Sequence, residues 1–272
     1  MKTTLYIACH KSSWYPAHPN YQILHVGAAI SDITLPGFSD DVGESISEKN
    51  SSYCELTGLY WIWKNDKTSD IVGLCHYRRY FAFQEPGRFS FIGSREITAG
   101  RDFKAYIEKM INPSKLNTYL DKYDMILPTA RSFSIGIEEY YQKEHIAEDW
   151  DIMKDVLNEL YPEYSHSMGK VFAGKWFYSY NMFVMRRKIF DEYMSWLFSI
   201  LNEVEKRITI SQDVYQRRVV GFLAERLLNV YVDYHHFKVK EIPIVFIDEQ
   251  KKALVYKKKL FKFIIRDIKR KW

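Results

Sequence analysis

Apolar positions along the chain follow two patterns that alternate from the N-terminus onwards. Short β-rich apolar runs bounded by polar or turn residues predict strands; they cover 4–9, 25–30, 71–75, 125–127, 180–185 and 242–247. Apolar residues three and four apart predict amphipathic helices; they cover 52–66, 103–120 with a break near Pro113, 137–160, 189–204 and 219–231. This alternation predicts an α/β fold of three layers, with a mostly parallel central sheet flanked by helices.

The helix expected over 52–66 has the clearest signals. Ser52 is the expected N-cap, and Glu55, three residues later, is the expected return partner of a capping box. One face then carries apolar residues at helical spacing: Leu56, Leu59, Tyr60 and Trp63. The stretches 35–47 and 81–100 hold the glycine, proline and short polar residues that are typical of loops.

Composition indicates a folded cytosolic protein. Of 272 residues, 47% are hydrophobic and 27% are charged, so a sizeable core is expected and disorder is excluded. The aromatic share of 17% suits a core, and it also suits sites that hold nucleobases or sugar rings. Cys9, Cys54 and Cys75 have neither zinc-site nor redox-pair spacing, which predicts buried, reduced thiols. No signal peptide and no apolar run of the roughly 20 residues that span a bilayer is recognisable.

Charge divides the chain into a body and a tail. The net charge is +5, but residues 251–272 hold ten Lys or Arg and one acid, so the tail carries +9 and residues 1–250 carry −4. The apolar residues of the tail form a helical stripe: Leu260, Phe261, Ile264, Ile265, Ile268 and Trp272. We expect one domain over 1–250 and a basic amphipathic tail over 251–272 that contacts an anionic membrane surface. A tail helix packed on the body is the alternative, and no motif supports nucleic-acid binding.

Basic side chains follow two predicted strands directly. His10 and Lys11 end the first strand, and the segment 76–79, His-Tyr-Arg-Arg, ends the strand over 71–75. Ligands of open α/β sheets bind beyond the carboxyl ends of strands, and Arg and Lys suit phosphate groups. The candidate phosphate-binding residues are therefore His10, Lys11, His76, Tyr77, Arg78 and Arg79. On an extended segment Arg78 and Arg79 point to opposite faces, so one is expected to reach the ligand and the other to brace a loop. A salt-bridge network is the alternative.

Further candidates lie at helix starts. Asn50 is expected to hold a ribose or base, and Glu55 has a ligand role and a capping role as alternatives. Glu225 lies in an otherwise apolar helix start with arginine neighbours, so it is either a general base or one half of a structural ion pair. The remaining candidates for donor binding are Asn181, Arg218 and Arg226.

Metal-site patterns are weak. Asp149 and Asp151 form a DxD sequence, but carboxylates two positions apart on a helix do not face one site, so we expect a solvated helix face there. The sequence holds no HExxH, no zinc spacing, no EF-hand loop, and neither GxGxxG nor GxSxG. No metal ligand is assigned.

Several segments together resemble one bacterial family. They are SISEKNSSYCELTGLYWIWKN at 45–65, VGLCHYRRYF at 72–81, YDMILP at 123–128, YNMFVM at 180–185, DEYMSWLFSIL at 191–201 and RRVVGFLAERLL at 217–228. The family, long described as of unknown function, is found in capsule, exopolysaccharide and O-antigen clusters and is regarded as a glycosyltransferase family of the GT-A type. The resemblance covers about residues 3–250 and leaves out the basic tail.

The resemblance implies a GT-A-like fold and a UDP-linked hexose donor, with galactose or galactofuranose favoured. The acceptor would be a lipid-linked or growing polysaccharide at the inner face of the cell membrane. Where GT-A enzymes place a DxD, this chain has His76, Tyr77 and Arg78, which leaves a Mn²⁺ or Mg²⁺ requirement open. The expected mechanism has the basic cluster and His76 holding the diphosphate while Glu225, or else Asp149, deprotonates the acceptor, so Glu225 and His76 are the expected catalytic residues. A sugar-phosphate transferase and a non-catalytic part of a polysaccharide assembly complex are the rival functions.

Overall fold

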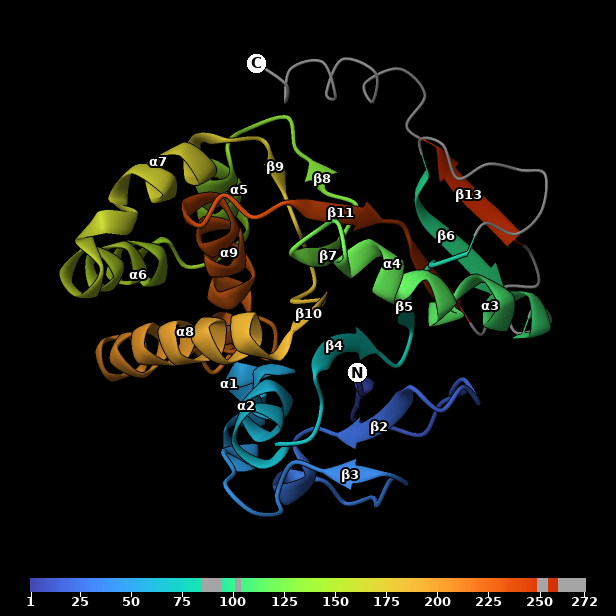
Figure 1. Cartoon of the computed structure of the whole chain (residues 1–272). Coiled ribbons are helices and arrows are strands. Elements are labelled where there is room, and N and C mark those ends of the chain that lie inside the picture. The colour runs from blue at the N-terminus through green and yellow to red at the C-terminus, as the bar shows by residue number, and fades with distance from the viewer. Residues whose placement is uncertain (85–93, 101–103, 249–253, 259–272) are drawn as a thin grey trace.

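The computed structural model describes residues 1–84, 94–100, 104–248 and 254–258. A large mixed sheet runs through the molecule and is covered by helices on both sides (Figure 1). Its strands are β1 Thr3–Cys9, β2 Tyr21–His25, β3 Phe38–Ser39, β4 Ile71–His76, β5 Arg79–Phe81, β6 Ser94–Gly100, β7 Met125–Pro128, β10 Phe183–Arg186, β11 Val239–Ile242, β12 Ile244–Asp248 and β13 Leu254–Lys258. Strands β8 Arg131–Ser132 and β9 Trp176–Phe177 form a separate antiparallel pair.

The part of the sheet that carries the site is parallel, as predicted. Strands β3, β2, β1 and β4 lie side by side in that order and run in one direction. Strand β10 joins the other side of β4 in the antiparallel direction, so the start of β10 meets the end of β4. Strand β5 turns back antiparallel against the end of β4 and leads to β12, β6 and β13.

Helices cover the two faces of the sheet. The described helices are α1 Asn50–Tyr53, α2 Leu56–Asn65, α3 Lys104–Met110, α4 Leu116–Leu120, α5 Ile137–Glu144, α6 Ala147–Leu160, α7 Ser165–Ala173, α8 Arg187–Arg207 and α9 Val219–Tyr234. Short 3-10 helices lie at Ala28–Ile30, Ser47–Lys49, Pro113–Lys115, Pro162–Tyr164 and Gln216–Arg218. Within the described ranges, none of the helices has the length and apolar character needed to cross a bilayer.

Two cores result from the alternation of side chains along the strands. Tyr6 and Leu74 pack toward the helices α2, α8 and α9, in the larger core. Ile7 and Cys75 point to the other face and pack with residues of α3 and α4, such as Ile107. Side chains of a strand alternate between the two faces of a sheet. Strands β1 and β4 have apolar residues at both sets of positions because helices cover the sheet on both faces there.

Three predicted elements differ in the structure. The helix expected over 137–160 is interrupted at His145, where extended backbone separates α5 from α6. The second strand is Tyr21–His25 rather than 25–30, because Gly27 adopts a left-handed conformation and begins a 3-10 turn. The segment 81–100, expected to be loop, contains strand β6.

The start of the predicted tail joins the sheet. Strand β13 Leu254–Lys258 pairs antiparallel with β6. The stripe from Leu260 onwards, where the basic amphipathic helix is predicted, lies outside the described residues.

Candidate functional site

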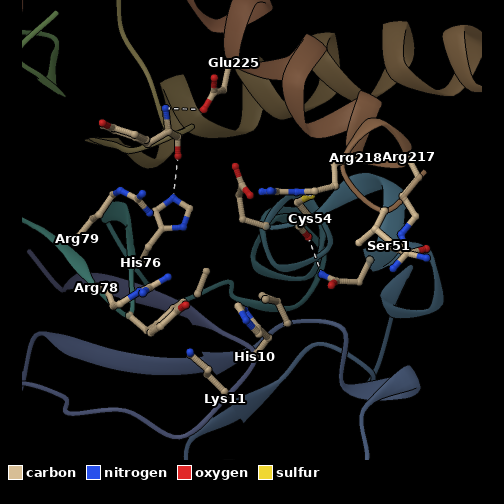
Figure 2. Close-up of a pocket in the computed structure, with 17 residues that line it drawn as sticks. His10, Lys11, Ser51, Cys54, His76, Arg78, Arg79, Arg217, Arg218 and Glu225 are labelled. Atoms are coloured by element: carbon tan, nitrogen blue, oxygen red, sulfur yellow. Dashed lines mark hydrogen bonds between the residues drawn. The ribbon is translucent and has the colours of Figure 1, made fainter. Parts of the chain in front are cut away.

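A cavity of about 670 Å³ lies beyond the carboxyl ends of β1 and β4, and Glu225 of helix α9 reaches it from the top of the view in Figure 2. Its size is within the usual range of small-molecule sites, about 300–1,000 Å³. Charged and polar side chains dominate its lining: His10, Lys11, Asn50, Ser51, Cys54, Glu55, His76, Tyr77, Arg78, Arg79, Tyr180, Arg217, Arg218 and Glu225. Ala8, Val26 and Val214 add apolar surface.

A tight reversal of the chain after β4 brings both arginines of the segment 76–79 to the cavity. Residues Tyr77 and Arg78 form the turn, and His76 pairs directly with Arg79 across the hairpin. Directly opposed residues of antiparallel strands point to the same face, so His76 and Arg79 lie together. The prediction that only one arginine reaches the ligand was therefore wrong in its premise, since the segment is a hairpin and not one extended strand.

The ring of Tyr77 organises the basic side chains at the strand ends. The imidazole of His10 lies edge-on to it, with ring centroids 5.2 Å apart. Lys11 Nζ lies 5.5 Å and Arg78 Cζ 4.8 Å from the ring centroid, both at cation–π distance. Strand β1 is parallel to β4 with Ala8 opposite His76, so the two strand ends predicted to share a ligand do lie side by side.

Cations outnumber acids in the cavity. Five of the lining side chains are Lys or Arg and two are Glu. Within the described part of the chain, no carboxylate lies within 4.0 Å of the charged nitrogens of Lys11, Arg78, Arg79, Arg217 or Arg218. The salt-bridge network that was the alternative interpretation is thus absent among these residues, and the cavity is suited to an anion.

The segment before β10 forms the opposite wall. Tyr180 and Asn181 both have positive φ, 80° and 50°, a strained conformation for Tyr that concentrates at functional sites. Helix α9 holds this segment by bonds to its backbone: Asn229 accepts from the nitrogen of Tyr178 at 2.7 Å and donates to its oxygen at 3.0 Å. Glu225 Oε1 accepts from the nitrogen of Tyr180 at 2.8 Å.

His76 is bonded to the same wall. Its Nε2 lies 2.7 Å from the carbonyl oxygen of Tyr180, a contact in which the ring nitrogen donates. Burial, with Arg79 nearby, lowers the pKa of His76 to about 4, so the ring is neutral near pH 7. His76 therefore fixes the wall and does not add a positive charge.

Glu225 is one of the two carboxylates that line the cavity, together with Glu55. Its side chain is 19% exposed and lines the cavity. Burial raises the pKa of Glu225, while the neighbouring Arg226 opposes that rise. Arg226 Nη1 donates to Glu225 Oε2 at 3.1 Å and to the carbonyl of Phe222 at 2.9 Å.

Arg226 itself does not line the cavity. It is 4% exposed, and its guanidinium lies over the rings of Tyr141 and Phe177 at 5.3 and 5.1 Å. It pairs with Glu225 from behind, so the ion-pair alternative for Glu225 is observed, and its role as a general base stays a prediction.

The capping box expected at Ser52 and Glu55 is wrong. Ser52 Oγ donates back to the carbonyl of Lys49, and Cys54, with φ of 53°, separates α1 from α2. Glu55 is freed from capping and faces the cavity, where Asn181 Nδ2 donates to its Oε1 at 2.7 Å. Burial raises the pKa of Glu55, against the lowering effect of this hydrogen bond.

Asn50 and Cys54 form the end of the cavity beside α1. Asn50 Nδ2 donates to the carbonyl of Cys54 at 2.7 Å and to Thr57 Oγ1 at 3.0 Å. Cys54 Sγ accepts from Arg218 Nε at 3.3 Å. Helix α9 can approach this closely because residue 221 is glycine; a Cβ there would lie 3.3 Å from Cys54 Sγ.

The DxD sequence does not lie in the cavity. Asp149 is buried, against the prediction of a solvated face, whereas Asp151 is exposed and pairs with Lys154. Burial, with Glu148 nearby, raises the pKa of Asp149 to about 6. Among the residues the structure describes, no group of three or more His, Cys, Asp or Glu side chains is arranged to hold a metal ion.

The cavity brings together most of the candidates named from sequence. Ten of them line it: His10, Lys11, Asn50, Glu55, His76, Tyr77, Arg78, Arg79, Arg218 and Glu225. Asn181 and Arg226 are buried behind the wall and hold Glu55 and Glu225. Sequence reasoning missed Ser51, Cys54, Tyr180 and Arg217. Of these four, Arg217 could have been found from the sequence, because it directly precedes the candidate Arg218.

Comparison with known proteins fits this geometry. The model of one protein family matches residues 4–236, most of the chain. The chain belongs to the family described as "Domain of unknown function (DUF4422)". The match spans the whole cavity lining and ends before the basic tail of this DUF4422 chain.

A solved structure is also similar to this DUF4422 chain. It is described as the apo structure of the bifunctional glycosyltransferase WbbM, with a TM-score of 0.83 and 31% identity. The similarity covers 97% of this chain and 48% of that one, so this chain spans about half the length of WbbM. No match was found among the curated proteins. The predicted α/β, GT-A-like fold is confirmed.

Proposed function

We propose that this protein is a glycosyltransferase that moves a hexosyl group from a UDP-sugar to a growing or lipid-linked glycan in bacterial polysaccharide synthesis. The observation that carries the proposal is the group of five Lys and Arg side chains in one cavity with Glu225, none of them within 4.0 Å of a carboxylate of the residues that the structure describes. The similarity to a bifunctional glycosyltransferase supports the same reaction class. Galactose or galactofuranose is the favoured sugar, on the family resemblance.

The cavity offers three regions to such a donor. Ala8 and Val26 with Asn50 provide an apolar floor and one amide for a nucleobase and ribose. Lys11 and Arg78, held on the ring of Tyr77, lie next to them and suit the diphosphate. The hexose then falls between the two walls, near the carboxylates of Glu55 and Glu225.

The transfer step follows from this placement. The acceptor hydroxyl gives its proton to Glu225 as its oxygen forms a bond to the anomeric carbon. The bond between that carbon and the diphosphate oxygen breaks, and UDP leaves with the electron pair. Lys11, Arg78 and Arg79 stabilise the charge that develops on the leaving diphosphate. Glu225 is the base in place of Asp149, which lies outside the cavity lining.

The rival functions predict different behaviour of the wild-type protein. A sugar-phosphate transferase would release UMP from the donor, because it would break the bond within the diphosphate. A non-catalytic assembly component would bind a ligand without turnover. Glycosyl transfer releases UDP, at a rate that increases when an acceptor is added.

The test is a donor screen with product analysis. The full chain is incubated with UDP-galactose, UDP-galactofuranose and UDP-glucose, with and without octyl galactoside acceptors, and UDP, UMP and glycan products are separated. Acceptor-dependent UDP release supports the proposal, and UMP release or the absence of turnover contradicts it. Excess EDTA is one arm, in which turnover should persist if the basic side chains alone neutralise the diphosphate. Loss of turnover that manganese restores would contradict that part.

We further propose that the protein works at the cytoplasmic face of the cell membrane, bound to anionic lipid through its basic tail. The support is the charge of +9 on residues 251–272 and the apolar stripe within it. A lipid-linked acceptor would then be presented at the surface where the enzyme resides.

A further inference from the structure

Two large apolar side chains lie exposed at the mouth of the cavity, on the loop that leads into α9. Val214 is 69% and Tyr215 51% exposed. Val214 and Arg217 line the cavity, whereas Tyr215 between them does not. The Tyr215 ring therefore lies at the rim of the cavity. A molecule that fits inside the cavity does not cover this ring.

The backbone of this loop is fixed by local hydrogen bonds. Asp213 Oδ1 accepts from the backbone nitrogens of Tyr215 and Gln216, at 2.9 and 2.8 Å. Gln216 Nε2 donates to the carbonyl of Glu144 at 3.0 Å, and its Oε1 lies 3.3 Å from His145 Nδ1. The loop is thus tied to the end of α5.

The ring of Tyr215 is held from behind as well. His145 is stacked against it, with centroids 5.6 Å apart and planes at 20°. Phe222 packs beside both rings, 5.1 Å from Tyr215 and 4.2 Å from His145. An exposed aromatic ring held in place by its neighbours loses little entropy when a ligand stacks on it.

The size of the cavity decides which substrate reaches this ring. About 670 Å³ suits one nucleotide sugar, so the sugars of a longer acceptor beyond the one attacked must lie outside. Val214 lines the cavity and is 69% exposed, so the cavity meets solvent beside it, and Tyr215 lies between Val214 and Arg217 along the chain. A sugar ring presents an apolar C–H face that suits an aromatic ring, and the phenolic hydroxyl suits its polar edge.

We propose that Tyr215 is the stacking platform of an acceptor subsite, which binds a sugar one or more positions away from the hydroxyl that is glycosylated. This inference rests on the proposed glycosyl transfer. It assigns the acceptor, and not the donor, to the rim formed by Val214, Tyr215 and Arg217. The enzyme then favours an oligosaccharide over a single sugar because only the former reaches the ring.

The test compares two acceptors that differ in length, octyl β-galactoside and an octyl-linked galactose trisaccharide. In the wild-type protein the trisaccharide should have the lower KM. Tyr215→Ala should raise the KM of the trisaccharide by about three- to tenfold, the range of an aromatic stacking contact, and leave the monosaccharide KM unchanged. Tyr215→Phe, which keeps the ring, should retain most of the preference.

Donor measurements separate the alternatives. The Kd of UDP and the slow hydrolysis of the donor without acceptor should be the same in Tyr215→Ala as in the wild type. Weaker UDP binding would mean that the ring stacks on the nucleobase and would overturn the proposal. An unchanged ratio of the two acceptor KM values would overturn it too, whereas absence of any transfer by the wild type would instead refute the proposed function. Phe38→Ala, which removes a 42% exposed ring on the edge strand β3, outside the cavity lining, is the matched control.

Discussion

The side-chain amide of Asn181 donates a hydrogen bond of 2.7 Å to the carboxylate of Glu55. This bond joins the start of β10 to the start of α2, and so connects two walls of the cavity. Asn181 is buried and left-handed, and its Nδ2 also reaches the carbonyl of Gly221 on α9 at 3.3 Å. One asparagine outside the cavity thus sets the position of a carboxylate inside it.

Replacing Asn181 separates its two contributions. Asn181→Ala loses the amide and places alanine in the left-handed region, which costs about 1–2 kcal/mol. Asn181→Gly loses only the amide, because glycine adopts this conformation freely. We expect both variants to reduce kcat, and Asn181→Ala to unfold at a lower temperature than Asn181→Gly. Equal melting temperatures, measured by calorimetry, would contradict the backbone argument.

Glutamine substitutions distinguish the two carboxylates. Glu225→Gln removes the proposed base and should lower kcat about 100-fold or more, with the Kd of UDP unchanged. Glu55→Gln keeps an oxygen that accepts from Asn181 and should have a smaller effect on kcat. Burial raises the pKa of Glu225, and the base must be ionised, so wild-type kcat should fall as the pH drops through that raised value. Equal losses in the two variants would argue against the assignment.

Arg78 offers a test of the anion site. Arg78→Ala should weaken UDP binding about 10- to 100-fold, the value of hydrogen bonds to a charged group, and reduce the dependence of Kd on salt. Arg78→Lys should fall in between, since lysine keeps the charge and loses the planar fork. Titration calorimetry gives these constants. Lys143→Ala removes an exposed lysine, paired with Glu139 on α5, and is the control expected to have no effect.

Two groups, the half-buried His145 and the buried Asp149, should contribute to the stability of the folded protein with opposite dependence on pH. Burial, with Arg226 nearby, lowers the pKa of His145 to about 4, so below pH about 6.5 the unfolded chain takes up a proton that the folded protein does not. Its contribution to stability therefore falls from pH 6.5 to 4. Asp149, with a pKa raised to about 6, takes up its proton first in the folded state and contributes stability as the pH falls from 6 to 4.

The two variants should therefore change the pH dependence of unfolding in opposite directions. Between pH 7 and pH 5, His145→Gln should reduce the drop in melting temperature, and Asp149→Asn should increase it, each by about 2–4 °C. Thermal unfolding followed by circular dichroism measures both. Parallel curves for the wild type and the two variants would show that these pKa shifts are absent.

The tail can be removed without touching the sheet. A chain ending at Lys258 keeps β13 and loses six Lys or Arg and one Asp, a net charge of +5. We expect it to lose binding to vesicles that contain phosphatidylglycerol and to keep its affinity for UDP. Unchanged flotation with such vesicles would contradict a membrane role of residues 259–272, and neutral phosphatidylcholine vesicles are the control.

The sequence allowed the cavity to be located because strand ends can be recognised from apolar runs. His10 and Lys11 follow one run, His76 follows another, and parallel pairing of the two strands is enough to bring them together. The reversal at Tyr77 and Arg78 was not predictable in the same way, since it lacks the glycine or asparagine that marks most two-residue turns.

Long-range contacts account for the other errors. Nothing near Asn181 in the sequence indicates that it lies behind the carboxylate of Glu55, because the packing of α9 and α2 on the segment before β10 brings the two together. Ser52 and Glu55 have the spacing of a capping box. The left-handed Cys54, which ends α1 early, turns Glu55 into the cavity instead.

The two bonds between Asn229 and the backbone of Tyr178 are those that an adjoining strand would make. The side chain of a helix residue thus takes the place of a neighbouring strand at Tyr178, and Glu225 and His76 hold the backbone of Tyr180. In the proposed reaction, an incoming sugar would meet wall atoms whose positions these hydrogen bonds already fix. Selection among epimers would then come from the misfit of a single hydroxyl against a rigid surface, and changing the preferred sugar would require altering α9 together with this segment.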